Sequence, residues 1–152
     1  MSVFNTLPMP IFFHKIARGG TRFRDQWGSG QFGASRPGHV HSRLHQGLDI
    51  TAEPGEPIRS PIDGVITREA FPYKGDNRFR GLLIEGVNEW KGIEVKIFYV
   101  QGMIQGRVDA GQIIGTAQDL SLRYRGITNH VHIEVRTSGT LVNPLEFFGM
   151  CF

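Results

Sequence analysis

The spacing of the apolar residues constrains this chain more than any other feature of the sequence. From residue 48 onward they occur in short runs, each closed by glycine, proline or aspartate. Runs of about four to eight residues bounded by turn-forming residues indicate strands, whereas a helix needs a longer run with a period near 3.6. Six or seven strands are predicted, in the runs 48–52, 56–61, 63–70, 81–87, 93–100, 112–117 and 130–137.

The composition agrees with a β-rich chain. Twenty glycines and eight prolines in 152 residues indicate many turns, and no segment has a convincing helical period. The length allows one domain with its own core and is short for two domains. The sequence therefore predicts a single all-β domain with long loops.

Two parts of the chain differ in pattern. Residues 1–26 show no strand-like period and are interpreted as an N-terminal arm, which precedes the domain at 27–152. The arm carries four apolar residues able to hold it on the domain, Phe4, Ile11, Phe12 and Phe13. Glycine, proline and polar residues break the strand pattern in three predicted loops, 27–44, 71–80 and 117–129.

Charge and cysteine content exclude several classes of protein. The formal net charge is +3, without a run of lysines or arginines or an RNA-binding aromatic signature, so no nucleic-acid partner is expected. The single cysteine, Cys151, allows no disulfide within the chain and no CxxC metal site. No apolar run approaches the roughly 20 residues of a membrane span, so no membrane partner is expected.

Four polar residues stand in two short motifs, His45 and Asp49 in HQGLD and His130 and His132 in HVH. On a strand, residues two apart point to the same face, so both histidines of HVH project together while the apolar residues between and after them enter the core. His45 and Asp49 share a face in either an extended or a helical segment. The glycine at 47 keeps the space between them clear.

These residue types suit a zinc site. Zinc accepts imidazole nitrogen and carboxylate oxygen, and catalytic zinc sites use three protein ligands and leave one position open. His45, Asp49 and one histidine of the HVH pair supply three ligands. The other histidine would stand beside the open position, where a neutral imidazole can transfer protons. A hydrolytic metal site is the chemistry that this set predicts.

The remaining histidines, His14, His39 and His41, are interpreted as polar loop residues. His41 is the one of them placed to lie at the rim of the site, because it shortly precedes His45 in the predicted long loop.

Several stretches together resemble the lysostaphin and LytM-type zinc metallopeptidases of the M23 family. The resemblance runs from about residue 27 to 148. Its stretches are GSGQFGASR, HQGLDI, PGEPIRSPIDGVI, VDAGQIIGTA, HVHIEV and VNPLEFF. It implies the antiparallel β core of that family, zinc (Zn2+) as the cofactor, and hydrolysis of a peptide bond in peptidoglycan. The implied zinc ligands are His45, Asp49 and His132, and the implied catalytic histidine is His130.

One position departs from the family pattern. Active members carry a second catalytic histidine in a Tyr-x-His motif, and here the segment reads IFYVQGM, with Gln101 at the expected position. A glutamine amide can donate a hydrogen bond to a developing oxyanion, but it cannot act as an acid or a base. Gln101 is accordingly predicted as a catalytic residue limited to hydrogen bonding.

The same departure makes the chain resemble the LECT2-like branch of the family, which implies a zinc-binding module without peptidase activity. Two functions therefore stay open: a peptidoglycan endopeptidase, and a module that binds wall fragments or a protein partner. A biotinyl or lipoyl carrier is disfavoured because PGEPIRSPIDGVI and VDAGQIIGTA contain no lysine.

The first 20 residues lack an early positive charge and a small-x-small cleavage motif, so no signal peptide is predicted. The localisation is left open. A wall hydrolase without its own signal would need delivery to its substrate, for which a phage or a secretion machine is the hypothesis.

Overall fold

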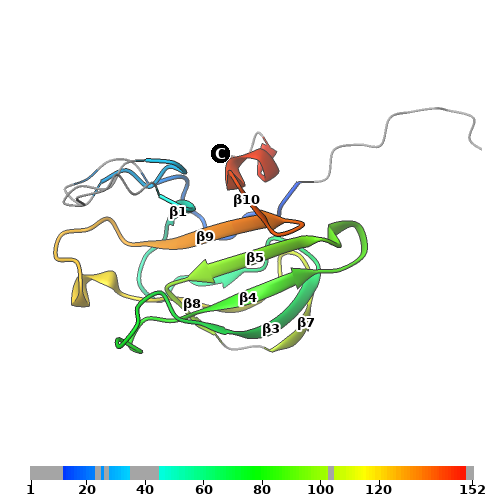
Figure 1. The fold of residues 1–152 in the computed structure, drawn as a ribbon. Coiled ribbons are helices and arrows are strands. Elements are labelled where there is room, and N and C mark those ends of the chain that lie inside the picture. Colours follow the sequence, from blue (N-terminus) through cyan, green and yellow to red (C-terminus); the bar gives the residue numbers. More distant parts are fainter. Residues whose placement is uncertain (1–11, 23–24, 26–27, 35–44, 103–104, 150–152) are drawn as a thin grey trace, which may run out of the picture.

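The computed structural model describes residues 12–22, 25, 28–34, 45–102 and 105–149 (Figure 1). Its regular elements are ten strands and three short 3-10 helices. The strands are β1 Leu48–Thr51, β2 Pro57–Arg59, β3 Gly64–Ala70, β4 Gly81–Gly86, β5 Ile93–Phe98, β6 Val100–Gly102, β7 Gly106–Val108, β8 Ile113–Ala117, β9 His130–Thr137 and β10 Thr140–Val142. The helices are η1 Asn88–Trp90, η2 Leu120–Leu122 and η3 Pro144–Phe147.

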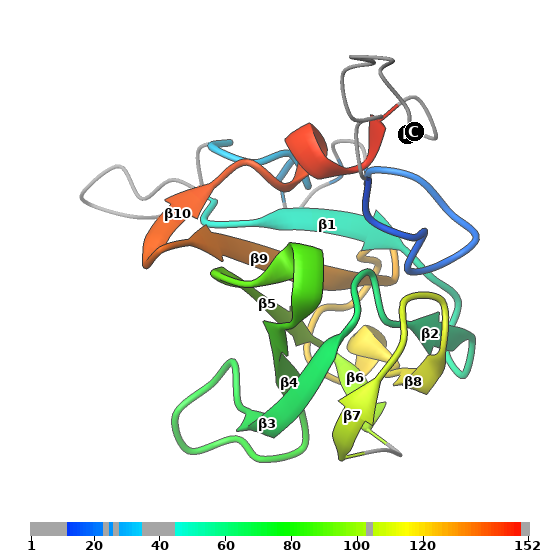
Figure 2. The same ribbon diagram turned by 90° about the vertical axis from the view of Figure 1, so that its right-hand side faces the viewer.

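Two antiparallel sheets form the body. The larger has the order β1-β9-β5-β4-β3-β7, with β10 also paired to β9, and the smaller has the order β2-β8-β6 (Figure 2). Every strand pair is antiparallel. The predicted all-β class and its antiparallel core are confirmed. Among the described residues no helix is long and apolar enough to cross a membrane.

The core explains why the predicted strands form. In β9 the residues Val131, Ile133 and Val135 are fully buried, and Val95 and Ile97 of the neighbouring β5 join them. Burial of such side chains contributes roughly 1.5–3 kcal/mol each. Each of the seven predicted runs contains an observed strand. The three strands that were not predicted, β6, β7 and β10, are three residues long and too short for a recognisable alternation.

One predicted strand differs from the structure in a way that matters for the site. The run 93–100 was expected to be continuous, but Tyr99 has φ of 69°, in the left-handed region that bulky residues rarely occupy. The chain therefore leaves the large sheet after Phe98 and enters the small sheet at Val100. Residue 101 consequently belongs to a different sheet from β9.

The described part of the arm packs on the body. Phe13 is buried and contacts the rings of Trp90, Phe147 and Phe148, and Ile16 is buried beside it. Phe12, also expected to hold the arm, is 49% exposed, with its ring lying beside Gly149. Phe4 and Ile11 lie outside the described residues.

The predicted loops agree where they are described. Residues 71–80 contain turns and bends only, and 118–129 contain the single turn of η2. Residues 28–34 are irregular. The rest of the predicted 27–44 loop lies outside the described residues.

Candidate metal centre

The two histidine motifs meet because β1 pairs with β9. The two strands lie side by side (Figure 2). In this antiparallel register Asp49 lies opposite His132, and Thr51 lies opposite His130. His45 precedes β1, and its imidazole reaches the same end of the strand pair. Leu48 and Ile50 are buried on the other face of β1. Strand alternation thus separates the polar cluster from the core.

Three ligand-type atoms form a nearly equilateral triangle. Nε2 of His45 lies 3.0 Å from Nδ1 of His132 and 3.1 Å from Oδ1 of Asp49. Nδ1 of His132 lies 2.9 Å from the same Oδ1. All three residues are almost fully buried. His45, Asp49 and His132 form a group able to hold a metal ion.

The donor set and its dimensions fit zinc. Ligand atoms at about 2.0–2.1 Å from a tetrahedral zinc lie roughly 3.3 Å apart, so the observed triangle needs to widen by only a few tenths of an ångström. Two nitrogens and one carboxylate oxygen are the donors that zinc accepts in catalytic sites.

Each histidine of the triangle is oriented by a hydrogen bond from its other ring nitrogen. His45 donates from Nδ1 to the carbonyl of Gln31 at 2.9 Å. His132 donates from Nε2 to Oε2 of Glu134 at 2.9 Å, and Glu134 in turn accepts from Arg136 at 3.3 Å. Such partners fix the ring and leave the opposite nitrogen directed at the ion.

Burial, neighbouring charges and hydrogen bonds shift the pKa values of two cluster residues. Burial disfavours the charge of His132, but its hydrogen bonds to Asp49 and Glu134 outweigh burial and raise its pKa to about 9. Burial likewise disfavours the Asp49 carboxylate, yet the charge of His130 and the hydrogen bonds of His132 and His45 lower its pKa well below the usual range. Without a metal, the protonated form of His132 is therefore favoured at neutral pH.

Gly47 is required by close approach. A Cβ at this position would lie 2.3 Å from the carbonyl oxygen of Ile133 and 2.7 Å from Nε2 of His132. Contacts this short do not occur, so any side chain at 47 would displace β9 or the imidazole. The expectation that this glycine keeps the site clear agrees with the structure.

His130 stands beside the triangle with its own support. It donates from Nδ1 to the carbonyl of Thr128 at 2.7 Å, and its Nε2 lies 3.3 Å from Oδ2 of Asp49. Burial lowers the pKa of His130 against the opposing effect of the Asp49 charge, which favours the neutral ring. Since Nδ1 carries the proton, Nε2 is left as the basic atom that faces the cluster.

Gln101 is not one of the residues grouped in the metal triangle. It is exposed on β6, where it pairs with Thr116 of β8. Among the residues that the structure describes, no hydrogen bond joins its side chain to the cluster. The residue of this segment that contacts His130 is Tyr99, whose ring meets the imidazole edge-on at 5.6 Å between centroids.

Sequence reasoning missed several residues around the cluster. Glu134 could have been found, because it shares a strand face with His132 at a spacing of two. Tyr73 could not: its hydroxyl bonds those of Tyr99 and Tyr124 at 2.6 and 2.5 Å, joining three separate segments without a common spacing. Arg22, which binds Asp49, had no recognisable signal either.

His14 does not join the cluster. His14 is exposed, and its Nδ1 bonds the carbonyl of Lys15 at 2.8 Å. His39 and His41 lie outside the described residues, so the expected place of His41 at the rim stays a prediction.

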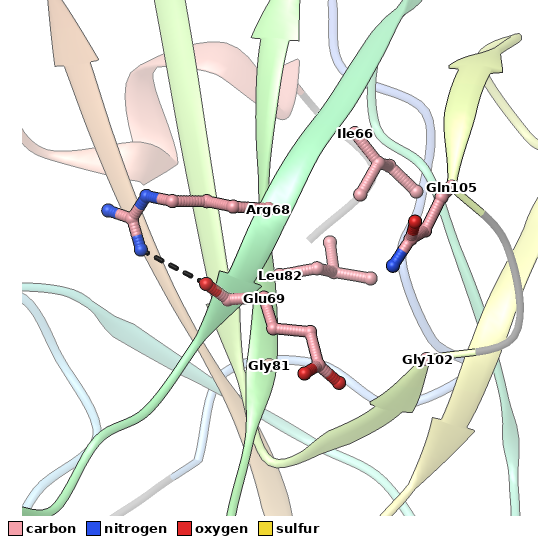
Figure 3. A pocket seen from close by; sticks show the side chains of 7 residues that line it. All are labelled: Ile66, Arg68, Glu69, Gly81, Leu82, Gly102 and Gln105. Atoms are coloured by element: carbon pink, nitrogen blue, oxygen red, sulfur yellow. Dashed lines mark hydrogen bonds between the residues drawn. The ribbon is translucent and has the colours of Figure 1, made fainter.

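A separate pocket lies between β3, β4 and β6 (Figure 3). Ile66 and Leu82 form its apolar wall, and Arg68, Glu69 and Gln105 its polar rim. A hydrogen bond of 3.1 Å joins the Arg68 guanidinium to the carbonyl of Glu69. None of the cluster residues lines this pocket.

Comparison with known proteins gives related sequences of two kinds. The chain is 34% identical over 112 residues to leukocyte cell-derived chemotaxin-2 of Bos taurus, covering 72% of this chain and 69% of the chemotaxin. It is 32% identical over 106 residues to the DD-carboxypeptidase/endopeptidase Mpg of Neisseria meningitidis serogroup B, covering 68% of this chain but only 23% of Mpg.

The fold is shared with lysostaphin. The solution structure of that protein superposes with a TM-score of 0.61 at 16% identity, over 88% of this chain and 57% of lysostaphin. The sequence profile of peptidase family M23 matches residues 43–144, which contain the metal triangle and His130. This match covers more than half of the chain, and the chain belongs to peptidase family M23.

Proposed function

We propose that this protein is a zinc-dependent endopeptidase that hydrolyses peptide bonds of peptidoglycan. The observation that carries the proposal is the buried triangle of His45, Asp49 and His132, with the basic nitrogen of His130 beside it. The similarity to Mpg, named as an endopeptidase, supports the reaction class.

The three triangle residues would hold the ion, and His130 would move the proton. When bound, zinc supplies Lewis-acid polarisation of the scissile carbonyl and makes water a usable nucleophile near neutral pH. Nε2 of His130 accepts a proton from the attacking water and returns it to the leaving amine. The Asp49 oxygen 3.3 Å away stabilises the imidazolium formed between these steps.

Gln101 would have the lesser role of a hydrogen-bond donor. Its amide has no acid or base function, but its N–H groups can donate to an oxyanion developing on the substrate. Its exposed position on β6 is accessible to a bound peptide.

A second function is favoured by two observations, the exposed Gln101 in place of a histidine and the 34% identity to chemotaxin-2. On this alternative the zinc site stabilises the fold, and the chain binds wall fragments or a protein partner without cutting peptide bonds.

Release of new amino groups from purified peptidoglycan distinguishes the two functions. The zinc-loaded chain is compared with its His130→Ala variant, and the zinc content of both is measured. His14→Ala serves as the matched control, because His14 is exposed and outside the cluster. For an endopeptidase, loss of the proton-transfer group should lower the rate by about 10²–10⁴-fold, while the control keeps its rate.

Equal rates in the chain and its His130→Ala variant would contradict the role of His130. No release from either protein with zinc bound would overturn the endopeptidase and support the binding module.

A further inference from the structure

We propose that Arg22, in the arm that precedes the family domain, is a positioning residue of the metal centre. It holds the Asp49 carboxylate in the rotation that presents one oxygen to the metal. The proposal rests on the zinc site of the proposed function and does not depend on whether the chain hydrolyses peptides. Arg22 lies outside the family match at 43–144.

The Arg22 guanidinium binds the Asp49 carboxylate oxygen that faces away from the triangle. Nε and Nη2 of Arg22 lie 3.1 and 3.0 Å from Oδ2 of Asp49. Oδ1 of the same carboxylate faces His45 and His132. Arg22 and Asp49 are each 2% exposed, so the pair is shielded from competing water.

The guanidinium is itself held from behind. Its Nη1 donates to Oδ2 of Asp25 at 2.8 Å and to the carbonyl of Gly28 at 2.9 Å. A planar group fixed on both edges has little freedom to rotate, which is the property that a positioning residue needs.

Asp25 extends this support to His130. Its Oδ2 accepts a hydrogen bond from the backbone N–H of Thr128 at 3.0 Å. The carbonyl of Thr128 accepts the Nδ1 proton of His130 at 2.7 Å. The pair Arg22–Asp25 therefore connects a metal ligand with the expected proton-transfer residue.

Backbone hydrogen bonds also hold Arg22 next to β1. Its N–H donates to the carbonyl of Asp49 at 2.7 Å, and Thr51 donates to the carbonyl of Gly20 at 2.8 Å. The segment thus lies along the edge of β1 opposite β9, as the blue segment beside β1 shows in Figure 2. Gly30 permits this packing, since a Cβ there would lie 2.6 Å from Cβ of Arg22 and 2.8 Å from Cβ of Asp49.

A consequence for metal affinity follows. With Oδ2 engaged by two N–H groups, the carboxylate binds a metal through Oδ1 alone and in one orientation. Outer partners of this kind typically contribute about 10–100-fold to metal affinity. Lysine keeps the charge but lacks the planar fork, so it replaces arginine poorly at such a site.

The test is the zinc dissociation constant, measured by competition with a chromophoric chelator. The full chain is compared with Arg22→Gln, Arg22→Lys and Arg59→Gln. Arg59 is the matched control because it is exposed and its side chain bonds only the carbonyl of Gly111 among the described residues. We expect a loss of about 10–100-fold for Arg22→Gln, about tenfold for Arg22→Lys, and no change for Arg59→Gln.

The melting temperature of each metal-free variant separates positioning from folding. A purely structural role would lower the melting temperature and leave the zinc affinity of the folded protein unchanged. Asp25→Asn is the milder variant should both Arg22 variants fail to fold. It weakens the support of the guanidinium and keeps the Arg22–Asp49 pair, so a severalfold loss of affinity is expected.

Zinc affinities within twofold of the wild type in the folded variants would overturn the proposal. If the wild-type chain bound no zinc, both the proposed zinc site and the proposed role of Arg22 would be overturned. A wild type that binds zinc tightly but releases no amino groups from peptidoglycan would overturn the endopeptidase alone.

Discussion

The β1–β9 pair and the corner between β5 and β6 form two unlike sides of the candidate site. On the β1–β9 side the ligand-type residues are buried, and each has its own supporting hydrogen bonds. At the corner, Gln101 is exposed, and no described hydrogen bond ties its side chain to the cluster.

From this difference we expect metal binding and substrate turnover to be separable in this fold. Metal binding needs rigid, desolvated ligands, and the pairing of β1 with β9 supplies them. The corner instead depends on the single residue Tyr99, whose left-handed backbone moves the chain from one sheet to the other. We therefore expect a change at the exposed Gln101 to alter chemistry without disturbing the metal site.

The largest effect is expected for Asp49→Ala. The substitution removes a ligand and one of the two carboxylates that pair with the buried Arg22. Removing one partner of a buried ion pair typically costs about 3–5 kcal/mol of stability. Zinc binding should fall by more than about 100-fold. Chemical denaturation and zinc titration measure both effects. An Asp49→Ala variant with wild-type stability and zinc affinity would contradict the role of Asp49 as a metal ligand.

A somewhat smaller effect is expected for Gly47→Ala. The added methyl group meets the carbonyl of Ile133 and the ring of His132 at distances that force one of them to move. Overpacking of this kind costs roughly 1–3 kcal/mol, and zinc affinity should fall because His132 is displaced. Gly55→Ala is the matched control for loss of a glycine away from the site, since open space surrounds its Cβ position while its positive φ adds only a local strain.

A rise in pH should lower the stability of the metal-free fold and raise the affinity for zinc. The pKa of His132 in the metal-free fold is about 9, above the roughly 6.5 of an unfolded histidine. Its contribution to stability is therefore complete below pH 6.5 and is lost as the pH rises through 9.

Zinc must displace the same proton from His132, so zinc affinity should rise between pH 6.5 and 9, by up to about tenfold per unit. Thermal melts without metal and zinc titrations over this range measure the two trends. Zinc affinity that is independent of pH would show that His132 is not a ligand.

The smallest effect on stability and metal binding is expected for Gln101→Ala. An exposed residue away from the core changes stability by less than about 0.5 kcal/mol, and zinc affinity should not change. Peptidoglycan hydrolysis should fall by about 10²-fold if the amide serves an oxyanion. Altered zinc affinity in this variant would contradict the separation of the two sides.

Much of the ligand side could be predicted from the sequence. Strand alternation placed His130 and His132 on one face, and short apolar runs gave seven strands. The antiparallel pairing that brings Asp49 opposite His132 was not predicted, because local patterns carry no information about strand partners. The family resemblance implied only that these two residues share a metal site.

The features that could not be predicted depend on contacts between segments distant in the sequence. Arg22 reaches Asp49 across 27 positions from an arm without strand period. The corner at Tyr99 interrupts a run that alternates in sequence, and only the backbone angle reveals the change of sheet. The strands β6, β7 and β10 are fixed by their neighbours rather than by their own three residues.

Anomalous diffraction at the zinc edge, from crystals of the zinc-loaded chain, tests the central claim most directly. We expect one strong peak, from a zinc ion at bonding distance from Nε2 of His45, Oδ1 of Asp49 and Nδ1 of His132, with His130 not bound to the ion. A peak at other residues, or none at full zinc loading, would contradict the account.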